Sequence, residues 1–275
     1  MSIDTIYIPT LGRSHNQITF DNMTENAQRV TRLVVQPKEK DLYPNYPILV
    51  LPENDIGITA TRRWIYEYAA DQKYCVADDD LLMIARKPWH YGEKTKRTMT
   101  AEDWDYFLNT TSDWLDDVSF GGTRRGNLPP TGIEYLESAP AACFFFFNGL
   151  ALPRADELDW SLPVCEDIHM VLQLFKKGYN NRVWDRFGYI SNILVDGGGG
   201  CNEWRTLKII NDTHEKLISY YPNHVSWNGI RENVMGGDFK KIKIKWKRMY
   251  LDSQISNLEE FMNDTHRQTN ELLSH

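Results

Sequence analysis

The sequence has few cysteines and no long apolar run, and each absence excludes a class of protein. The four cysteines, Cys75, Cys143, Cys165 and Cys201, include no Cys-x-x-Cys pair, so neither a disulfide framework nor a zinc ribbon is indicated. No stretch approaches the roughly 18 consecutive apolar residues of a membrane-spanning helix. We therefore expect reduced, mostly buried thiols and no membrane partner.

The amino terminus also lacks the basic and apolar segments of a secretory signal, and the chain contains no low-complexity tract. Hydrophobic residues make up 41% of the chain and charged residues 25%, which is typical of an ordinary folded protein. At 275 residues the chain is long enough for one large domain, or for one domain with a small appendage. We expect a folded, cytoplasmic protein.

Positive charge is in the minority, since the formal net charge is -7. This excludes a protein that coats nucleic acid with its whole surface, but a local basic groove needs only clustered cations. Two clusters are present: Arg86, Lys87, Lys94, Lys96 and Arg97 form the first, and Lys241, Lys243, Lys245 and Lys247 form the second. We interpret both as candidate nucleic-acid contacts. The alternatives are a solvated loop for the first cluster and a lysine-protected edge strand for the second.

Short β-rich runs alternate with helical patterns over the first 85 residues, as in βαβ units around a mainly parallel sheet. The patterns predict strands at 5–9, 32–36, 48–51, 74–77 and 141–150, helices at 16–29, 56–70, 101–117, 165–177 and 204–220, and a loop at 121–132. The predicted fold class is α/β, with a Rossmann-like, mainly parallel sheet flanked by helices.

A basic strand and a helix are expected at the carboxyl end. Lysines alternate with Ile242, Ile244 and Trp246 over 241–247, and this period of two gives a strand one cationic face. An amphipathic helix is predicted from Ser253 onward. We place the main domain at 1–235 and this C-terminal extension, packed on the same domain, at 236–275.

The aspartates Asp78, Asp79 and Asp80 directly follow the apolar strand at 74–77. Like charges at contact distance repel, and burial increases the cost, so a divalent cation such as Mn²⁺ or Mg²⁺ is the simplest counter-charge. The carboxylates of Asp78 and Asp80, at i and i+2, can both face such a cation. The carboxyl end of a parallel strand is also where open α/β sheets bind ligands. A solvated acidic turn is the alternative.

A second pair of acids, Glu166 and Asp167, begins the predicted helix at 165–177. A positioned carboxylate can remove the proton of an attacking hydroxyl, although acids at a helix start also complement the helix dipole. We consider Asp196, His214 and His224 as a late metal ligand and assign none of them. His214 lies on an apolar helical face, which favours a packing role.

Four segments in this order resemble the GT-A fold glycosyltransferases: 8–13 at the first strand end, 57–63 at a helix start, 74–80, and 165–167. In that family the first strand end and its turn contact the nucleobase, and a basic residue of the early helix helps to hold the nucleotide. The resemblance implies donor-binding roles for Pro9, Thr10, Arg13, Arg62, Arg63, Asp78 and Asp79. It also implies that Asp78 lies on the ribose side and that Asp80 binds the metal. In inverting members the acceptor base would be Asp167 or, as second choice, Glu166.

The start at 8–13, the helix entry at 56–63 and the small size resemble a phage subgroup, the TET-associated glycosyltransferases, which modify hydroxymethylated pyrimidines in viral DNA. The resemblance implies a nucleoside-diphosphate sugar as co-substrate, a UDP-sugar carrying a hexose or arabinose, and 5-hydroxymethylcytosine in phage DNA as acceptor. The host cytoplasm would then be its location. The alternatives are a glycosyltransferase acting on cell-surface carbohydrate or lipid, and a non-catalytic nucleotide-binding module.

Overall fold

The computed structural model describes residues 2–89, 94–191, 206–232 and 238–273. Its large sheet contains β1 (Thr5–Pro9), β2 (Thr31–Val35), β3 (Ile48–Val50), β4 (Lys73–Ala77), β5 (Leu81–Arg86), β6 (Lys96–Thr98), β7 (Phe120–Arg125), β8 (Tyr135–Glu137), β9 (Phe144–Asn148) and β10 (Asn181–Ser191). The helices that flank it are α1 (Ile18–Asp21), α2 (Glu25–Arg29), α3 (Ile58–Tyr68), α4 (Ala101–Asp117) and α5 (Glu166–Lys176). The predicted helix at 101–117 and the first strand at 5–9 are confirmed at both ends.

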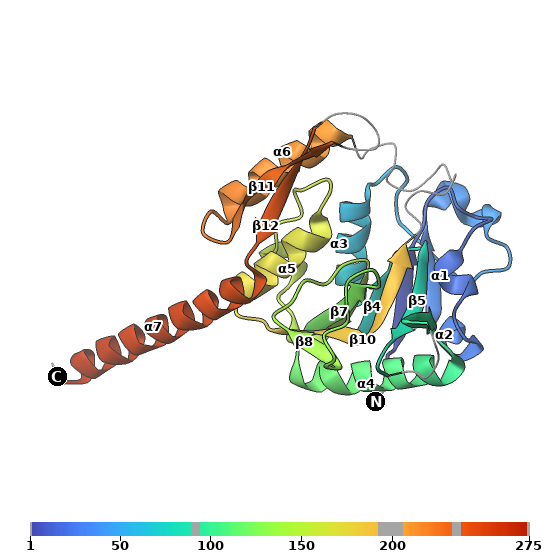
Figure 1. The fold of residues 1–275 in the computed structure, drawn as a ribbon. Helices are drawn as coiled ribbons and strands as arrows, with labels where there is room; N and C mark the ends of the chain where they lie inside the picture. The colour runs from blue at the N-terminus through green and yellow to red at the C-terminus, as the bar shows by residue number, and fades with distance from the viewer. Residues whose placement is uncertain (1, 90–93, 192–205, 233–237, 274–275) are drawn as a thin grey trace.

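The sheet has the order β3-β2-β1-β4-β9-β7-β10-β5-β6, with β8 paired to β10. The first four strands of this order are mutually parallel, and β7 and β10 are also parallel to each other. Antiparallel strands enter beyond β4, where β9 pairs with both β4 and β7. The predicted fold class, an α/β fold with a sheet flanked by helices and a C-terminal β/helical extension, is confirmed (Figure 1).

Two hydrophobic cores lie on the two faces of the sheet. Ile65 of α3 and Phe175 of α5 pack into one core, and Phe20 of α1 and Phe107 of α4 pack into the other. Figure 1 shows the corresponding helices on opposite sides of the strands. Because both faces are covered, ligands reach the sheet where its strands end. The parallel strands β1 and β4 end side by side, at what we call the carboxyl edge of the sheet.

The loop predicted at 121–132 is wrong in its first half, because β7 extends to Arg125. The two glycines that suggested a loop are required by packing. A Cβ on Gly121 would lie 2.2 Å from the ring of Phe146, and one on Gly122 would lie 2.7 Å from the Ala141 side chain. Glycine therefore allows β7 to pass under its neighbours here.

The C-terminal part of the chain contains a helix packed on a two-stranded sheet. Helix α6 (Leu207–Tyr220) contacts both β11 (Val225–Glu232) and β12 (Asp238–Ile244), which pair antiparallel. The boundary that the sequence analysis placed after residue 235 therefore falls between two paired strands. Lys247 belongs to α7 (Trp246–Leu273) and not to the strand, because β12 ends at Ile244.

Helix α7 contacts α5 near its start and then extends away from the rest of the molecule (Figure 1). It is the longest described helix, at 28 residues. None of the described helices combines the length and the apolar character needed to cross a membrane.

Candidate functional site

The aspartate turn after β4 is fastened to the turn after β1 through Asp79. Its carboxylate accepts hydrogen bonds from Thr10 Oγ1 at 2.7 Å and from Arg13 Nη1 at 2.5 Å. Burial raises the pKa of Asp79 to about 6, although Arg13 and Thr10 act to lower it. Thr10 and Arg13, both expected near the donor, therefore meet Asp79 at the shared edge of the sheet. Pro9 is buried at the end of β1 beside them.

Two polar residues that the sequence analysis missed hold this arrangement. Thr19 donates its hydroxyl to the Asp78 carbonyl at 2.5 Å, and its backbone N–H donates to the Asp79 carbonyl at 3.0 Å. The fully buried Gln17 donates through Nε2 to Thr10 Oγ1 and to the Arg13 carbonyl, both at 2.9 Å. The sequence does not reveal Thr19, because its partner Asp78 is 59 residues away. The partners of Gln17 are near in sequence, but only the folded turn after β1 brings them to its side chain.

Arg62 joins the aspartate turn to the start of α5. Its Nη2 donates to Asp78 at 2.6 Å, and its Nη1 lies 2.8 Å from Glu166 Oε1. Burial alone would lower the pKa of Arg62, but the carboxylates of Glu166 and Asp78 raise it above its ordinary value. The guanidinium therefore stays charged and brings both predicted acidic motifs into one site.

Glu166 and Asp167 differ sharply in exposure. The Glu166 side chain is 5% exposed, and burial raises its pKa while Arg62 lowers it. Asp167 is half-buried. Its charge raises the pKa of Arg62 and of Arg125, the last residue of β7. Glu166 is therefore an internal partner of Arg62, whereas Asp167 is the acid that a ligand can reach.

Replacement of Arg62 by alanine should destabilise the protein, because it leaves the Glu166 carboxylate buried without its cation. Breaking a buried pair in this way costs roughly 3–5 kcal/mol, to be measured by denaturant unfolding. The matched control is Arg63→Ala, one residue along α3, where the exposed Arg63 pairs with Glu67 and the expected loss is below about 1 kcal/mol. Equal losses in the two variants would contradict the bridging role of Arg62.

The charges at this edge suit a divalent cation. The five carboxylates of Asp78, Asp79, Asp80, Glu166 and Asp167 meet the cations of Arg13, Arg62 and Arg125. The pKa of Asp80 is raised by burial and by the neighbouring Asp78, while Arg13, 3.6 Å away, lowers it. Among the described residues no group of three or more His, Cys, Asp or Glu side chains is arranged around one metal position. Two carboxylates are nevertheless a sufficient protein contribution where Mg²⁺ or Mn²⁺ also binds phosphate oxygens and water.

Comparison with known proteins identifies the family of this chain. The model of the TET-Associated Glycosyltransferase family matches residues 5–200. The chain belongs to this family. It is therefore a glycosyltransferase, as the resemblance predicted.

Individual relatives are distant from this glycosyltransferase. The Beta-glucosyl-HMC-alpha-glucosyl-transferase of Enterobacteria phage T2 is 22% identical over 230 residues, which cover 77% of this chain and 80% of the relative. The crystal structure of S. aureus TarS 1–349 is 11% identical, with a TM-score of 0.44, over 78% of this chain and 65% of that one. Its complex with UDP-GlcNAc has a TM-score of 0.45, 11% identity and coverages of 78% and 66%. The chain thus spans about two thirds of the TarS 1–349 length.

Two of the predicted site residues of this glycosyltransferase lie elsewhere. Arg63 is exposed on α3 and pairs with Glu67, so it does not join the aspartates. The prediction that Arg86 contacts nucleic acid is wrong, because its side chain is buried and pairs with the fully buried Asp185 at 2.5 Å. The sequence analysis counted Arg86 as a surface cation because nothing near it in the sequence reveals a partner 99 residues away.

The other members of the first basic cluster differ in their exposure and in their partners. Arg97 pairs with Asp103 in the first turn of α4, so its charge is used in capping that helix. Lys94 is exposed, and Lys87 and Lys96 are half-buried. In the second cluster, Lys243, Lys245 and Lys247 are exposed and Lys241 is half-buried. Lys241, Lys243 and Lys247 make no ion pair within the described part of the chain.

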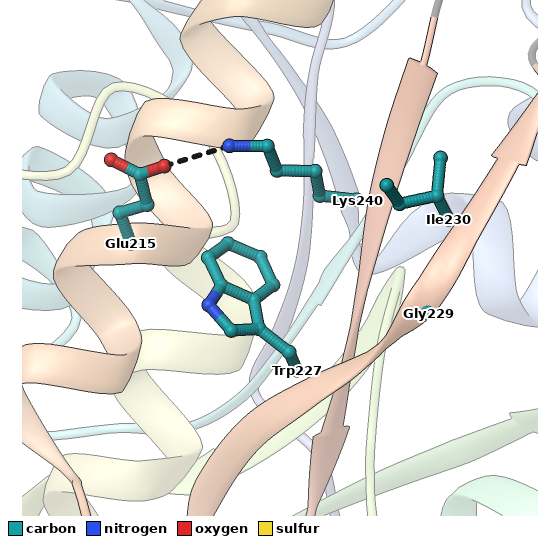
Figure 2. Close-up of a pocket in the computed structure, with 5 residues that line it drawn as sticks. All are labelled: Glu215, Trp227, Gly229, Ile230 and Lys240. Carbon is teal, nitrogen blue, oxygen red and sulfur yellow. Dashed lines mark hydrogen bonds and ion pairs between the residues drawn. The ribbon is translucent and has the colours of Figure 1, made fainter.

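A cavity of about 290 Å³ lies in the C-terminal extension and not at the aspartates. Figure 2 shows the Lys240 ammonium group reaching the Glu215 carboxylate, 3.0 Å away, above the ring of Trp227. Its lining residues come from α6, β11 and β12. The aspartate site is instead built from the large sheet, α3 and α5. We therefore do not assign this cavity to the sugar donor.

The histidines considered as late metal ligands have other partners. His214 is buried and its Nδ1 lies 2.8 Å from the Lys240 carbonyl, and desolvation by burial lowers its pKa. His224 lies 2.9 Å from Asp252 of α7. Both side chains therefore connect parts of the extension. Asp196 lies outside the described residues.

Proposed function

We propose that the protein transfers a sugar from a nucleoside-diphosphate donor to the hydroxyl of 5-hydroxymethylcytosine in DNA, in a reaction that depends on Mn²⁺ or Mg²⁺. The observation that carries the proposal is that Arg62 forms ion pairs with both Asp78 and Glu166, at the start of α5. It brings a candidate metal site and a candidate base together at the ligand-binding edge of an α/β sheet. The family supplies the reaction class.

The donor side of the proposed site lies at the turn after β1. Thr10 and Arg13 border the nucleotide there, with Asp79 fixing both of them. Asp78 faces the ribose, and Arg62 behind it contributes positive charge near the diphosphate. A UDP-sugar is the proposed donor, carrying a hexose or arabinose. Arg63 has no part in this arrangement, since it points to Glu67 on the surface of α3.

Asp80 and Asp78 hold the divalent cation in the proposed site. When bound, such a cation polarises phosphate oxygens and stabilises the negative charge of a departing diphosphate. The two carboxylates are two residues apart in the sequence and supply hard oxygen ligands. Arg13 Nη1, 3.6 Å from Asp80 Oδ2, keeps Asp80 in position. The excess of acids over arginines at this edge is the observation that supports a cation.

Asp167 acts as the base in the proposed reaction. Its carboxylate takes the proton of the acceptor hydroxyl as the hydroxyl oxygen bonds to the anomeric carbon and the bond from that carbon to the diphosphate oxygen breaks. Arg62 holds Glu166, the preceding residue, inside the protein, which orients the first turn of α5 and so positions Asp167. Glu166 has this positioning role in the proposal and does not touch the acceptor.

DNA is the proposed acceptor, and exposed cations of the chain support it. Arg125 is exposed at the end of β7, and the charge of Asp167 acts on it through space, so we propose that it contacts a phosphate next to the target nucleotide. The exposed lysines of the second basic cluster offer further phosphate contacts. A base within a duplex must be extruded before its hydroxymethyl group can reach Asp167. The phage T2 relative, whose name states an HMC substrate, supports the same acceptor.

The direct test is intact-mass analysis of hydroxymethylcytosine-containing DNA after incubation with the protein, Mn²⁺ and a panel of nucleotide sugars. A mass gain of one sugar is the expected result, and it identifies donor and acceptor together. Release of nucleoside diphosphate without any gain in DNA mass would refute the DNA acceptor and direct the search to carbohydrate or lipid. Absence of both would leave only nucleotide binding.

The double variant Lys241→Gln/Lys243→Gln should bind DNA more weakly, because two phosphate contacts are lost. The slope of log affinity against log salt concentration should become shallower by about 2, since each phosphate contact contributes about 0.9. The control is Lys176→Gln/Lys177→Gln, two exposed lysines at the far end of α5, which should leave the slope unchanged. An identical slope in all three proteins would exclude the lysines of β12 from the DNA contact.

A further inference from the structure

Helix α7 has one face that packs against its own chain. Trp246 and Tyr250 lie against Phe175 of α5, with ring centroids 6.4 and 6.1 Å apart, and Met249 is 4% exposed. Gln254 donates to the Gly178 carbonyl at 3.1 Å on the same face. These contacts fix the start of α7 on the body of the protein and leave its other side turned to solvent.

That other side carries large apolar residues. Leu251 is 44% exposed, Ile255 53% and Leu258 60%. At 3.6 residues per turn, these three lie on one stripe, about 140° around the helix from the face that contacts α5. Since α7 extends away from the body (Figure 1), no described part of the same chain covers the stripe. Contiguous exposed apolar surface of this kind marks an interaction site.

The spacing of the stripe identifies what can cover it. The steps of four and three between Leu251, Ile255 and Leu258 continue in the sequence through Met262, Thr265, Thr269 and Leu272. Such a repeat is the heptad of a coiled coil, with isoleucine, methionine and threonine at the a positions and mostly leucine at the d positions. The average step of 3.5 residues over 251–272 is the spacing that a partner helix of the same kind needs.

We propose that α7 pairs with α7 of a second copy of this chain in a parallel, two-stranded coiled coil. A β-branched residue at a, Ile255, with leucine at d favours two strands in parallel. Parallel pairing also places the neutral Gln254, at a g position, opposite Glu259 of the partner subunit, so like charges do not face each other. Most of the stability of a protein helix comes from packing of its apolar face, and a partner helix supplies that packing here. The proposal does not depend on the sugar or the acceptor.

Light scattering after size exclusion tests the pairing on the full chain. The unmodified protein should have twice the monomer mass of 32.1 kDa, and Leu258→Glu should reduce it to one monomer mass. Ser256→Glu places the same charge on the opposite side of the same helix, where Ser256 is exposed, and should remain dimeric. A monomeric unmodified protein would overturn the proposal. So would a Leu258→Glu protein that stays dimeric.

A cross-linking measurement keeps the proposal testable if Leu258→Glu fails to fold. In a parallel coiled coil the two d positions of one layer face each other, so Leu258→Cys should form a disulfide-linked dimer on mild oxidation. Ser256→Cys should form none, and the unmodified protein gives the background from its own cysteines. A lack of cross-linking in Leu258→Cys, or equal cross-linking in the two variants, would exclude parallel pairing through this stripe.

Discussion

The Asp80→Asn variant should lose at least about 1,000-fold in metal-dependent donor turnover, because the metal loses one of its two proposed carboxylate ligands. A bound cation contributes several kcal/mol to stabilising the charge of a departing diphosphate, and each 1.36 kcal/mol corresponds to a tenfold change in rate. The measurement is release of nucleoside diphosphate as a function of Mn²⁺ concentration. The fold should be retained, since the pKa of Asp80 is already raised by burial and by Asp78, and its removal relieves repulsion.

Asp105→Asn is the matched control for this experiment, because Asp105 is exposed on α4, away from the aspartate turn. It should leave turnover and its metal dependence unchanged. Direct Mn²⁺ binding in the presence of nucleoside diphosphate should be weakened only in Asp80→Asn. Full activity in Asp80→Asn would remove Asp80 from the metal site and leave the aspartate turn as a structural feature.

The Asp167→Asn variant should lose 100-fold to 10,000-fold in sugar transfer, the range typical of a lost general base, while its affinity for the donor nucleotide stays unchanged. The distinction follows from the proposed site, in which Asp167 is half-buried at the start of α5 while the proposed nucleotide contacts lie at the aspartate turn and the β1 turn. Single-turnover transfer and equilibrium donor binding measure the two properties separately.

Glu166→Gln provides the comparison, since it removes the adjacent charge without removing the proposed base. Because Glu166 is the buried partner of Arg62, this variant should have a lower free energy of unfolding. Its rate of sugar transfer should fall less than that of Asp167→Asn. Unchanged turnover in Asp167→Asn would reject Asp167 as the base. Loss of donor binding together with turnover would instead place Asp167 on the donor side.

Local sequence patterns predicted the strands and turns of the site well. An apolar run that ends in three aspartates reads as a strand running into an acidic turn, and β4 ends at Ala77, directly before Asp78. Likewise the acids at 166 and 167 do begin a helix. These features depend on neighbouring residues alone, so periodicity and capping preferences are sufficient to find them.

Pairings between distant residues were beyond such patterns. Arg62 and Arg63 are equivalent in the sequence, yet one is buried between two acidic motifs and the other is exposed beside Glu67. The helix places successive residues about 100° apart, so only the position of α3 on the sheet decides which arginine faces the site. The same reason explains the incorrect assignment of Arg86, whose partner Asp185 comes from β10.

The sequence by itself determined the α/β fold class, the family resemblance and the acidic turn at the end of β4, because each depends on the order of short motifs. The tertiary structure alone decided which polar side chains meet: Asp79 with Thr10 and Arg13, and Arg62 with Asp78 and Glu166. It also showed the apolar stripe of α7 exposed. The physical reason is that burial and ion pairing depend on the packing of elements far apart in the chain, which the local sequence does not encode.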